Sequence, residues 1–394
     1  MSGKRLPYAR VGIVGAGQLG LMLCDAARRL GIGSCVLDSD PGAPAFARAD
    51  HSIVGDRFDP PSLRKLAASS DVITFEIEHA DSATLAELEA AGTAVRPSAT
   101  VLDTVRDKWR QRTALERAGV PGPRAYLWSD DGERPGGRSS GNVPLEPPFV
   151  QKLRFGGYDG RGVKVIRSED GEPLAGASLV EELVDIRCEV AVLVARTPSG
   201  REIAYPPVFM EFDPAANICT RCLLPAGLEP DVAERCRSIA LQAVRALGAV
   251  GICAVELFVT GDDRVLVNEL APRPHNSGHL TMEASATGQF EQHLRAILDL
   301  PLGSVETVRP AVMVNVLGGG ASGASTVSGY EKLLELPEAH LHLYDKRPSK
   351  PGRKMGHITV CADRLETAVE VADRAQALFR LYGRNSDRPE ADTR

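Results

Sequence analysis

A chain of 394 residues exceeds the usual size of one hydrophobic core, so we expect two or three domains. Its 43% hydrophobic and 25% charged residues are ordinary for a globular protein, and a formal net charge of -6 gives no reason to expect a nucleic acid or an acidic membrane as partner. The sequence shows neither a secretory signal nor a membrane-spanning apolar run, and its eight cysteines follow no disulfide framework. We therefore expect a cytoplasmic protein with reduced, structural cysteines.

Residues 11–95 alternate short apolar runs with amphipathic segments, which predicts a small parallel sheet with crossover helices. The first run, "VGIVGAGQLG", has the GxGxxG spacing at Gly15, Gly17 and Gly20, and Asp38 ends the next run. This arrangement is typical of a dinucleotide-binding turn. The same glycines would also serve a cofactor-free turn in which the chain packs tightly, so both interpretations stay open.

The following segments predict a different architecture. Residues 98–123 indicate one or two amphipathic helices, and Trp128 to Pro148 read as a flexible surface insertion rich in Gly, Pro and Ser. From Phe149 onward the pattern indicates a second domain of hairpin-connected strands. Helices are expected near residues 231–247 and 289–300, and short strands after Pro301 lead to a last helix over residues 365–383.

Two glutamates stand in the otherwise apolar strands of a predicted hairpin, "CAVELFVTGDDRVLVNEL". If Asp262 and Asp263 form a two-residue loop, Glu256 lies directly opposite Glu269, and any other even loop keeps the two on one face. Opposed carboxylates repel, and a hard cation with oxygen ligands, Asn268 among them, would compensate the repulsion. The alternative is an amphipathic hairpin with both glutamates in solvent.

The segment "APRPHNSGH" follows this hairpin and is too polar and too rigid for a core. It places Arg273, His275 and Asn276 within four residues, with a proline on either side of the arginine. A solvated turn seldom concentrates these residue types, so we expect an anion-binding site here.

A second glycine-rich segment, "QKLRFGGYDGRG", begins with Lys152 on a predicted strand. Its four glycines free the backbone to curl N–H groups around phosphate oxygens, and the lysine adds a positive charge. The segment lacks the GK[ST] signature of a Walker loop. A plain glycine-rich hairpin turn is the alternative.

Taken in order, the motifs resemble those of ATP-grasp enzymes, and within them the 5-(carboxyamino)imidazole ribonucleotide synthase family. The resemblance spans residues 10–381 and is most specific in "GAGQLGLML", "GGYDGRG", "NELAPRPHNSGH", "GQFEQHLRAI" and "GRKMGHITV". It implies a mixed α/β and α+β fold: an N-terminal Rossmann-like (pre-ATP-grasp) domain over 1–104, a two-lobed ATP-grasp domain over 105–300 that contains the 128–148 insertion, and a small β-rich C-terminal domain with a terminal helix over 301–394.

The resemblance also implies the chemistry. The ATP γ-phosphoryl group passes to bicarbonate, and the resulting carboxyphosphate, directly or through released CO2, carboxylates the amino group of 5-aminoimidazole ribonucleotide in purine biosynthesis. The implied cofactors are ATP and Mg²⁺, the partners are these small molecules, and the assembly is a homodimer. Phosphoryl transfer asks mainly for positioning and charge neutralisation, so lysines, an arginine and metal-binding carboxylates are the side chains to expect.

Residue roles follow from the same resemblance. It assigns ATP binding to Lys108, Lys152, Gly157, Gly160, Glu181, Val184, Glu189 and Asn268, metal binding to Glu256 and Glu269, catalysis to Tyr158, Asp159, Arg273, His275 and Asn276, and ribonucleotide binding to Gln18, Glu78, Arg353 and Lys354. The sequence departs from the family at Phe212, which stands about where many members carry a histidine near ATP.

Three other functions remain as alternatives. Another ATP-grasp ligase, such as a formate-dependent glycinamide ribonucleotide transformylase, would share the domain plan and the carboxylate hairpin. A nucleotide-binding regulatory module would have little need for two opposed carboxylates. An NAD-dependent dehydrogenase would use the N-terminal glycines but leave the second half of the chain unexplained.

Overall fold

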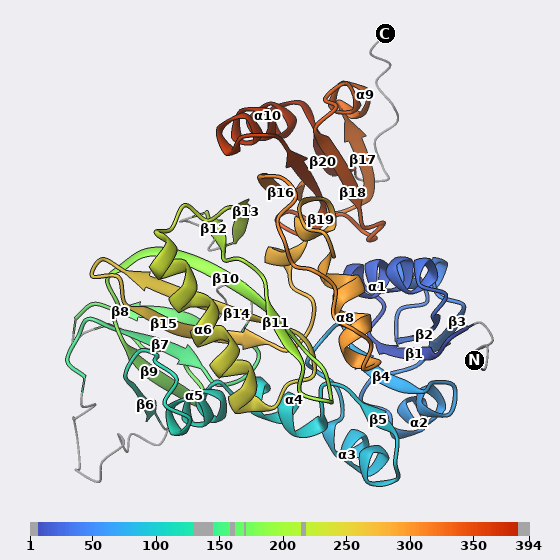
Figure 1. The fold of residues 1–394 in the computed structure, drawn as a ribbon, viewed down its shortest axis with the longest axis horizontal. Coiled ribbons are helices and arrows are strands. Elements are labelled where there is room, and N and C mark those ends of the chain that lie inside the picture. Colours follow the sequence, from blue (N-terminus) through green and yellow to red (C-terminus); the bar gives the residue numbers. More distant parts are fainter. Residues whose placement is uncertain (1–6, 129–144, 158–161, 169–170, 214–217, 385–394) are drawn as a thin grey trace.

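The computed structural model describes residues 7–128, 145–157, 162–168, 171–213 and 218–384 (Figure 1). The N-terminal unit is a sheet of strand order β3-β2-β1-β4-β5 in which neighbouring strands run parallel. Its elements are β1 (Arg10–Val14), α1 (Gln18–Arg29), β2 (Gly33–Asp38), η1 (Pro44–Ala47), β3 (His51–Val54), α2 (Pro60–Ala68), β4 (Val72–Phe75), α3 (Ser82–Ala90) and β5 (Ala94–Val95).

This unit confirms the predicted Rossmann-like arrangement and adds one strand. The sequence pattern gave no signal for β3, because only Ile53 of its four residues is buried. β3 lies at the edge of the sheet and pairs only with β2. A short edge strand needs little apolar surface, so hydrophobic periodicity cannot reveal it.

The segment that leaves this unit forms two helices, α4 (Ala99–Arg106) and α5 (Lys108–Arg117). The helices separate at Asp107, whose backbone is extended and whose carboxylate accepts hydrogen bonds from the N–H groups of Trp109 (3.0 Å) and Arg110 (3.4 Å). Asp107 thus caps α5 and starts a new helix direction.

Two sheets of mainly antiparallel strands follow. The smaller has the order β6-β9-β7-β8, and the larger begins β15-β14-β10-β12-β13. The elements are β6 (Ala125–Trp128), β7 (Phe149–Leu153), β8 (Val163–Ile166), β9 (Ser178–Glu182), β10 (Ile186–Arg196), β11 (Glu202–Ala204), β12 (Val208–Phe212), β13 (Cys219–Leu224), α6 (Pro230–Leu247), β14 (Gly251–Thr260), β15 (Val265–Ala271), η2 (Asn276–Gly278), α7 (Thr281–Ala284) and α8 (Gln289–Ile297). The apolar run of β10 is buried on both faces because α6 and α8 each pack against it.

The C-terminal strands extend the larger sheet through β16, β19 and β18, since β16 pairs with β13. The elements are β16 (Ala311–Gly320), β17 (Ala324–Ser328), α9 (Tyr330–Leu334), β18 (Ala339–Leu343), β19 (Lys354–Cys361), α10 (Leu365–Leu378) and β20 (Arg380–Arg384). The sheet is therefore continuous across the expected boundary near residue 300. None of the helices within the described ranges has the length and hydropathy needed to cross a membrane.

The last helix was predicted over residues 365–383, but in the structure it ends earlier and a strand follows it. α10 ends at Leu378, and β20 then pairs with β16 in parallel and with β17 in antiparallel orientation. The reason is a change of period: Arg380 is exposed, Leu381 is buried and Gly383 is buried again, which is strand-like alternation.

Helix α8 joins the N-terminal unit to the larger sheet (Figure 1). Phe290 and Leu294 share one hydrophobic core with residues of α1. On the same helix, the buried His293 accepts a hydrogen bond from the N–H of Ile252 on Nδ1 (3.0 Å), and its Nε2 lies 2.8 Å from the Thr74 hydroxyl. The carboxyl end of β4 is thereby fixed against the strand that carries Glu256.

Candidate active site

The N-terminal glycine turn is occupied by the protein's own carboxylates. Glu76 accepts hydrogen bonds from the N–H groups of Gly17 (2.5 Å) and Gly20 (2.6 Å), and Asp38 accepts one from Ala16 (2.9 Å). A Cβ at Gly15 or Gly17 would collide with the Glu76 side chain. Glu76 thus accepts the hydrogen bonds that these N–H groups would otherwise donate to a dinucleotide pyrophosphate. The glycines serve close packing, which removes the support for the dehydrogenase alternative.

The predicted opposition of Glu256 and Glu269 is present, but the loop differs from the expected one. Thr260 and Arg264 close the hairpin through a backbone hydrogen bond of 3.0 Å, which leaves a three-residue loop with Asp263 in the left-handed region. Such an odd loop alone would bring Asn268 opposite Glu256. A β-bulge between the pairs Leu257–Val267 and Glu256–Glu269 inserts one extra residue and restores the opposition.

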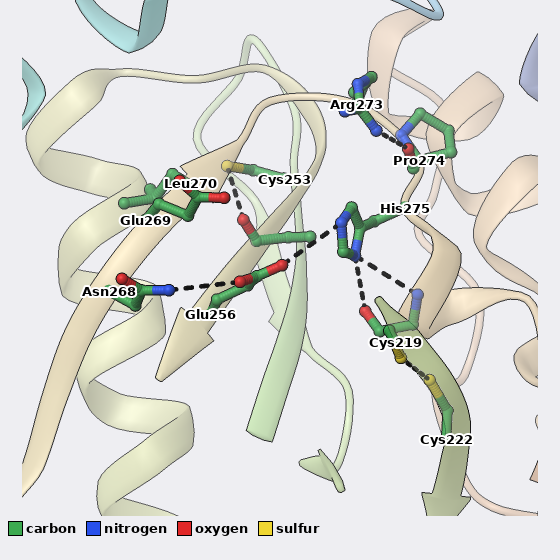
Figure 2. A network of polar contacts seen from close by, with 12 residues as sticks. Cys219, Cys222, Cys253, Glu256, Asn268, Glu269, Leu270, Arg273, Pro274 and His275 are labelled. Atoms are coloured by element: carbon green, nitrogen blue, oxygen red, sulfur yellow. Dashed lines mark hydrogen bonds and ion pairs between the residues drawn. The ribbon is translucent and has the colours of Figure 1, made fainter. Parts of the chain in front are cut away.

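The two glutamates differ in their surroundings (Figure 2). The Glu256 carboxyl group lies between Asn268 Nδ2 and His275 Nε2, each 3.5 Å from one of its oxygens. Burial and the charges of Glu269 and Glu189 raise the pKa of Glu256 to about 8. Burial also acts on Glu269, but its ion pair with Lys108 outweighs this and holds the pKa of Glu269 below its usual value.

Lys152 joins the smaller sheet to the hairpin. Its ammonium group lies 2.7 Å from Glu181 Oε2 and donates to Asn268 Oδ1 at 2.8 Å. A small pocket of about 10 Å³ lies at this junction, lined by Lys108, Gln111, Arg112, Lys152, Glu181, Asn268 and Glu269. Five residues that the resemblance assigns to ATP or metal therefore meet in one place, although they come from α5, β7, β9 and β15.

The carboxylate of Glu181 is fully engaged within the protein. It is 3% exposed and lies between Lys152 and Arg112, whose charges outweigh its burial and lower its pKa. Val184 follows β9 and is half-buried, and Glu189 lies on β10 opposite Met210 and Phe258. Burial raises the pKa of Glu189. The adenine and ribose contacts assigned to these residues remain predictions.

The segment after β15 carries one arginine, a neutral histidine and an asparagine. Arg273 lies 2.7 Å from Glu78, which belongs to the N-terminal unit, and also donates to the Pro274 carbonyl. Burial, with the charges of Arg273 and Lys354, lowers the pKa of His275 to about 3, so its imidazole is neutral at pH 7. Among the described residues, the buried Nδ2 of Asn276 has no hydrogen-bond partner. A donor left in this state is suited to an oxygen ligand.

The remaining predicted residues fall in three places. Gln18 is the first residue of α1, directly after the glycine turn. Arg353 donates to the Pro348 carbonyl (2.7 Å), and the charge of Lys354 acts on both Glu256 and His275. In the second glycine segment, Gly157 is described, whereas Tyr158, Asp159 and Gly160 lie outside the described residues.

The sequence analysis missed several residues of this region. Arg154 binds the helix cap Asp107 through Nε (3.0 Å) and Nη2 (2.5 Å), next to Lys108. Arg112 and Gln111 face β15 from α5. Nothing in the amphipathic pattern of the helix separates these inward side chains from its exposed arginines. Glu76 could have been suspected, since a carboxylate directly after an apolar strand faces the glycine turn of a Rossmann-like unit.

Three protein-family models match the chain in order: a ribonucleotide synthetase preATP-grasp domain over residues 8–106, an ATP-grasp domain over 125–290, and a phosphoribosylaminoimidazole carboxylase C-terminal domain over 311–371. The N5-carboxyaminoimidazole ribonucleotide synthase of Mycobacterium tuberculosis is 40% identical over 389 residues, which cover 96% of this chain and 89% of the relative. The synthase of Synechococcus elongatus is 38% identical and covers 95% and 94%.

Solved structures agree with the sequence relatives. The N5-carboxyaminoimidazole ribonucleotide synthetase of Thermotoga maritima superposes with a TM-score of 0.86 at 40% identity, covering 95% of this chain and all of that one. An Aspergillus clavatus synthase in complex with ADP and 5-aminoimidazole ribonucleotide gives 0.83 at 32% identity, covering 94% and 98%. These matches span the glycine turn, the carboxylate hairpin and the C-terminal sheet together. The chain therefore belongs to the N5-carboxyaminoimidazole ribonucleotide synthase family of ATP-grasp enzymes.

Proposed function

We propose that this ATP-dependent ligase of purine biosynthesis activates bicarbonate at the hairpin site. The γ-phosphoryl group of ATP passes to a bicarbonate oxygen, and the resulting carboxyphosphate supplies the carboxyl group for the 5-amino group of aminoimidazole ribonucleotide. ADP and inorganic phosphate are released. The observation that carries the proposal is the opposed pair Glu256 and Glu269 beside Lys108 and Lys152, because this chemistry needs a cation site and phosphate-binding charges at one point.

Magnesium fits the residues of the hairpin. Glu256, Glu269 and the amide oxygen of Asn268 are hard oxygen donors, and Mg²⁺ binds one or two carboxylates while water and substrate phosphates complete its octahedron. No cluster of three or more His, Cys, Asp or Glu suited to a metal occurs in the described part of the chain, which agrees with a site completed by the nucleotide. The raised pKa of Glu256 indicates that its ionised form is unstable in this site, and a bound cation would stabilise that form. When bound, the ion would neutralise the phosphate oxygens.

The chain's own residues would divide the remaining work. Lys108 and Lys152 meet the nucleotide phosphates as point charges. Arg273 and Asn276 hold the bicarbonate oxygens: Arg273 supplies the charge, and Asn276 has a buried donor without a partner. His275 stays neutral and orients the Glu256 carboxyl group. The resemblance also assigns catalytic roles to Tyr158 and Asp159, which lie outside the described residues.

The ribonucleotide would lie between the N-terminal unit and the start of β19, where Gln18, Glu78, Arg353 and Lys354 contribute polar groups. A related Aspergillus clavatus enzyme has been solved with ADP and 5-aminoimidazole ribonucleotide bound, which supports this ribonucleotide as the substrate. We also retain as proposals the domain limits 1–104, 105–300 and 301–394, a homodimer, and a cytoplasmic location. The eight cysteines, all free in the structure, suit a reducing compartment.

Phosphate release measures the proposed reaction directly. We expect ATP consumption with aminoimidazole ribonucleotide plus bicarbonate and none with glycinamide ribonucleotide plus formate. Glu269→Gln should abolish Mg²⁺-dependent turnover and leave the circular dichroism spectrum unchanged, whereas Glu116→Gln, an exposed change on α5, should have no effect. Turnover of formate, or full activity of Glu269→Gln, contradicts the proposal.

A further inference from the structure

The opposition of Glu256 and Glu269 depends on a single irregularity of β15. Between the loop and the bulge, Val265 of β15 lies opposite Val259 of β14. On the other side of the bulge the pairing is shifted by one residue, and Leu270 lies opposite Val255. Asn268 is the extra residue, and no residue of β14 is paired with it in the strand ladder. Without the bulge, the period of two would carry the Glu269 side chain to the opposite face of the sheet. Whatever stabilises the bulge therefore stabilises the metal-binding geometry.

A bulge turns backbone groups away from the strand ladder, and these groups need other partners. β15 is the edge strand of the larger sheet, so the unpaired groups face outward. Arg112 donates to the carbonyl of Val267 through Nη1 (2.9 Å) and to that of Asn268 through Nη2 (3.1 Å). The N–H of Val267 donates to the Pro121 carbonyl at 2.8 Å. One guanidinium thus satisfies two consecutive carbonyls at the irregular point.

The same guanidinium is anchored on its other side. Its Nε and Nη2 donate to Glu181 Oε1 at 3.1 Å and 2.8 Å, and the side chain is 7% exposed. Glu181 binds Lys152, and Lys152 binds the Asn268 side chain. The contacts form a closed ring that joins α5, β9, β7 and the bulge.

The chain makes room for this arrangement at one glycine. A Cβ at Gly122 would collide with Arg112 Nη1 and would also lie close to the Val267 carbonyl that this nitrogen binds. A lysine could not replace the arginine, because an ammonium group lacks the planar fork that reaches two carbonyls and a carboxylate together.

We infer that Arg112 is a positioning residue that holds the β15 bulge and so keeps Glu269 opposite Glu256. The metal-binding part of this inference rests on the proposed function. Arg112 contacts neither the carboxylates of the metal pair nor any reacting group; it acts through the Val267 and Asn268 carbonyls. Its loss should therefore weaken the response to Mg²⁺ more than it disturbs the rest of the fold.

The test compares Arg112→Met, Arg112→Lys and Gly122→Ala with Arg117→Met, a change at an exposed arginine of the same helix. Amide hydrogen exchange of the ligand-free proteins reports the bulge without any metal or turnover. We expect exchange in residues 265–271 to rise by about tenfold or more in Arg112→Met and in Gly122→Ala, with β16 unchanged. Arg112→Lys should resemble Arg112→Met, and Arg117→Met should match the unaltered protein.

A kinetic measurement follows the same variants. The Mg²⁺ concentration that gives half-maximal ATP turnover should rise about tenfold in Arg112→Met at saturating ATP, by more than kcat falls. Unchanged exchange in 265–271, increased exchange spread through the whole protein, or full recovery by Arg112→Lys would each overturn the inference. If Arg112→Met does not fold, the same measurements on Gly122→Ala test the inference, because the added Cβ displaces the Arg112 guanidinium. A failure of the metal assignment is recognised separately, because Glu269→Gln would then retain its Mg²⁺ response while the exchange result for Arg112→Met still holds.

Discussion

Binding of a Mg²⁺-nucleotide should release a proton from Glu256. In the ligand-free protein the pKa of this carboxyl group is raised to about 8, first by burial and then by Glu269 and Glu189. A metal ligand must be deprotonated, so the cation and the proton compete for the same oxygens. Lys108 adds no proton to this release, because its raised pKa keeps it charged at neutral pH.

The size of the effect follows from the pKa. A group with a pKa of about 8 is about 90% protonated at pH 7 and about 10% protonated at pH 9. Binding should therefore release about 0.9 proton at pH 7 and about 0.1 at pH 9. The same competition makes Mg²⁺-nucleotide binding about tenfold weaker at pH 7 than at pH 9, which corresponds to about 1.4 kcal/mol.

Isothermal titration calorimetry in two buffers of different ionisation enthalpy measures the release at each pH. A titration of Mg²⁺-ADP gives the proton count, and a titration of ADP with EDTA supplies the metal-free control. Carbon-13 NMR of labelled glutamate gives the Glu256 pKa of the ligand-free protein independently, with Glu256→Gln to assign its signal. A release that is equal at pH 7 and pH 9 would refute the reasoning.

Three further predictions concern stability. Glu256→Gln should raise the melting temperature of the ligand-free protein more at pH 9 than at pH 5. The folded-state pKa of Glu256 lies above the 4.5 of an ordinary glutamate, so the wild-type protein loses stability as the pH rises from there toward 8. An equal gain in melting temperature at both pH values would contradict this. Asp107→Asn should cost about 1–3 kcal/mol in urea unfolding at pH 7. Arg154 lowers the Asp107 pKa against the effect of burial, so this difference should shrink as the pH falls through 3.8 and below; a constant difference counts against the ion pair. Glu76→Ala should cost about 1–3 kcal/mol, because the N–H groups of Gly17 and Gly20 lose their acceptor, and calorimetry with NAD should give no binding heat for either protein.

In the hairpin, hydrophobic periodicity predicted which residues face each other but not the loop and the bulge that bring them together. Alternation of apolar residues was enough to place Glu256 and Glu269 on facing strands, and the structure confirms their opposition. The route to it was wrong, since a three-residue loop and a bulge replace the expected two-residue loop. Two shifts of one residue cancel, and a pattern of period two cannot distinguish two cancelling shifts from none.

Residues that act across elements were missed by the sequence analysis, and for Arg112 no local signal exists. Arg112 lies on a helix with several arginines, and only the packing of α5 against β15 separates it from the exposed Arg117. Glu76 directly follows the strand β4, but its partners lie almost sixty residues earlier. The local sequence shows that a side chain is polar. Its role depends on contacts with residues far away in the sequence, and these contacts exist only in the folded protein.

The ion pairs of the site explain how its charges are kept in place before a nucleotide binds. Lys108 pairs with Glu269, Lys152 with Glu181, and Arg273 with Glu78. The first two pairs each join two elements, and the third joins the segments that follow β15 and β4. At Glu181, which is 3% exposed, a charge without a partner would cost several kcal/mol. Phosphate oxygens can replace the carboxylates as partners of the lysines, and a cation can replace Lys108 at Glu269. Binding then exchanges partners among these charges. For the deeply buried pair Lys152 and Glu181, much of the cost of removing water was already met during folding.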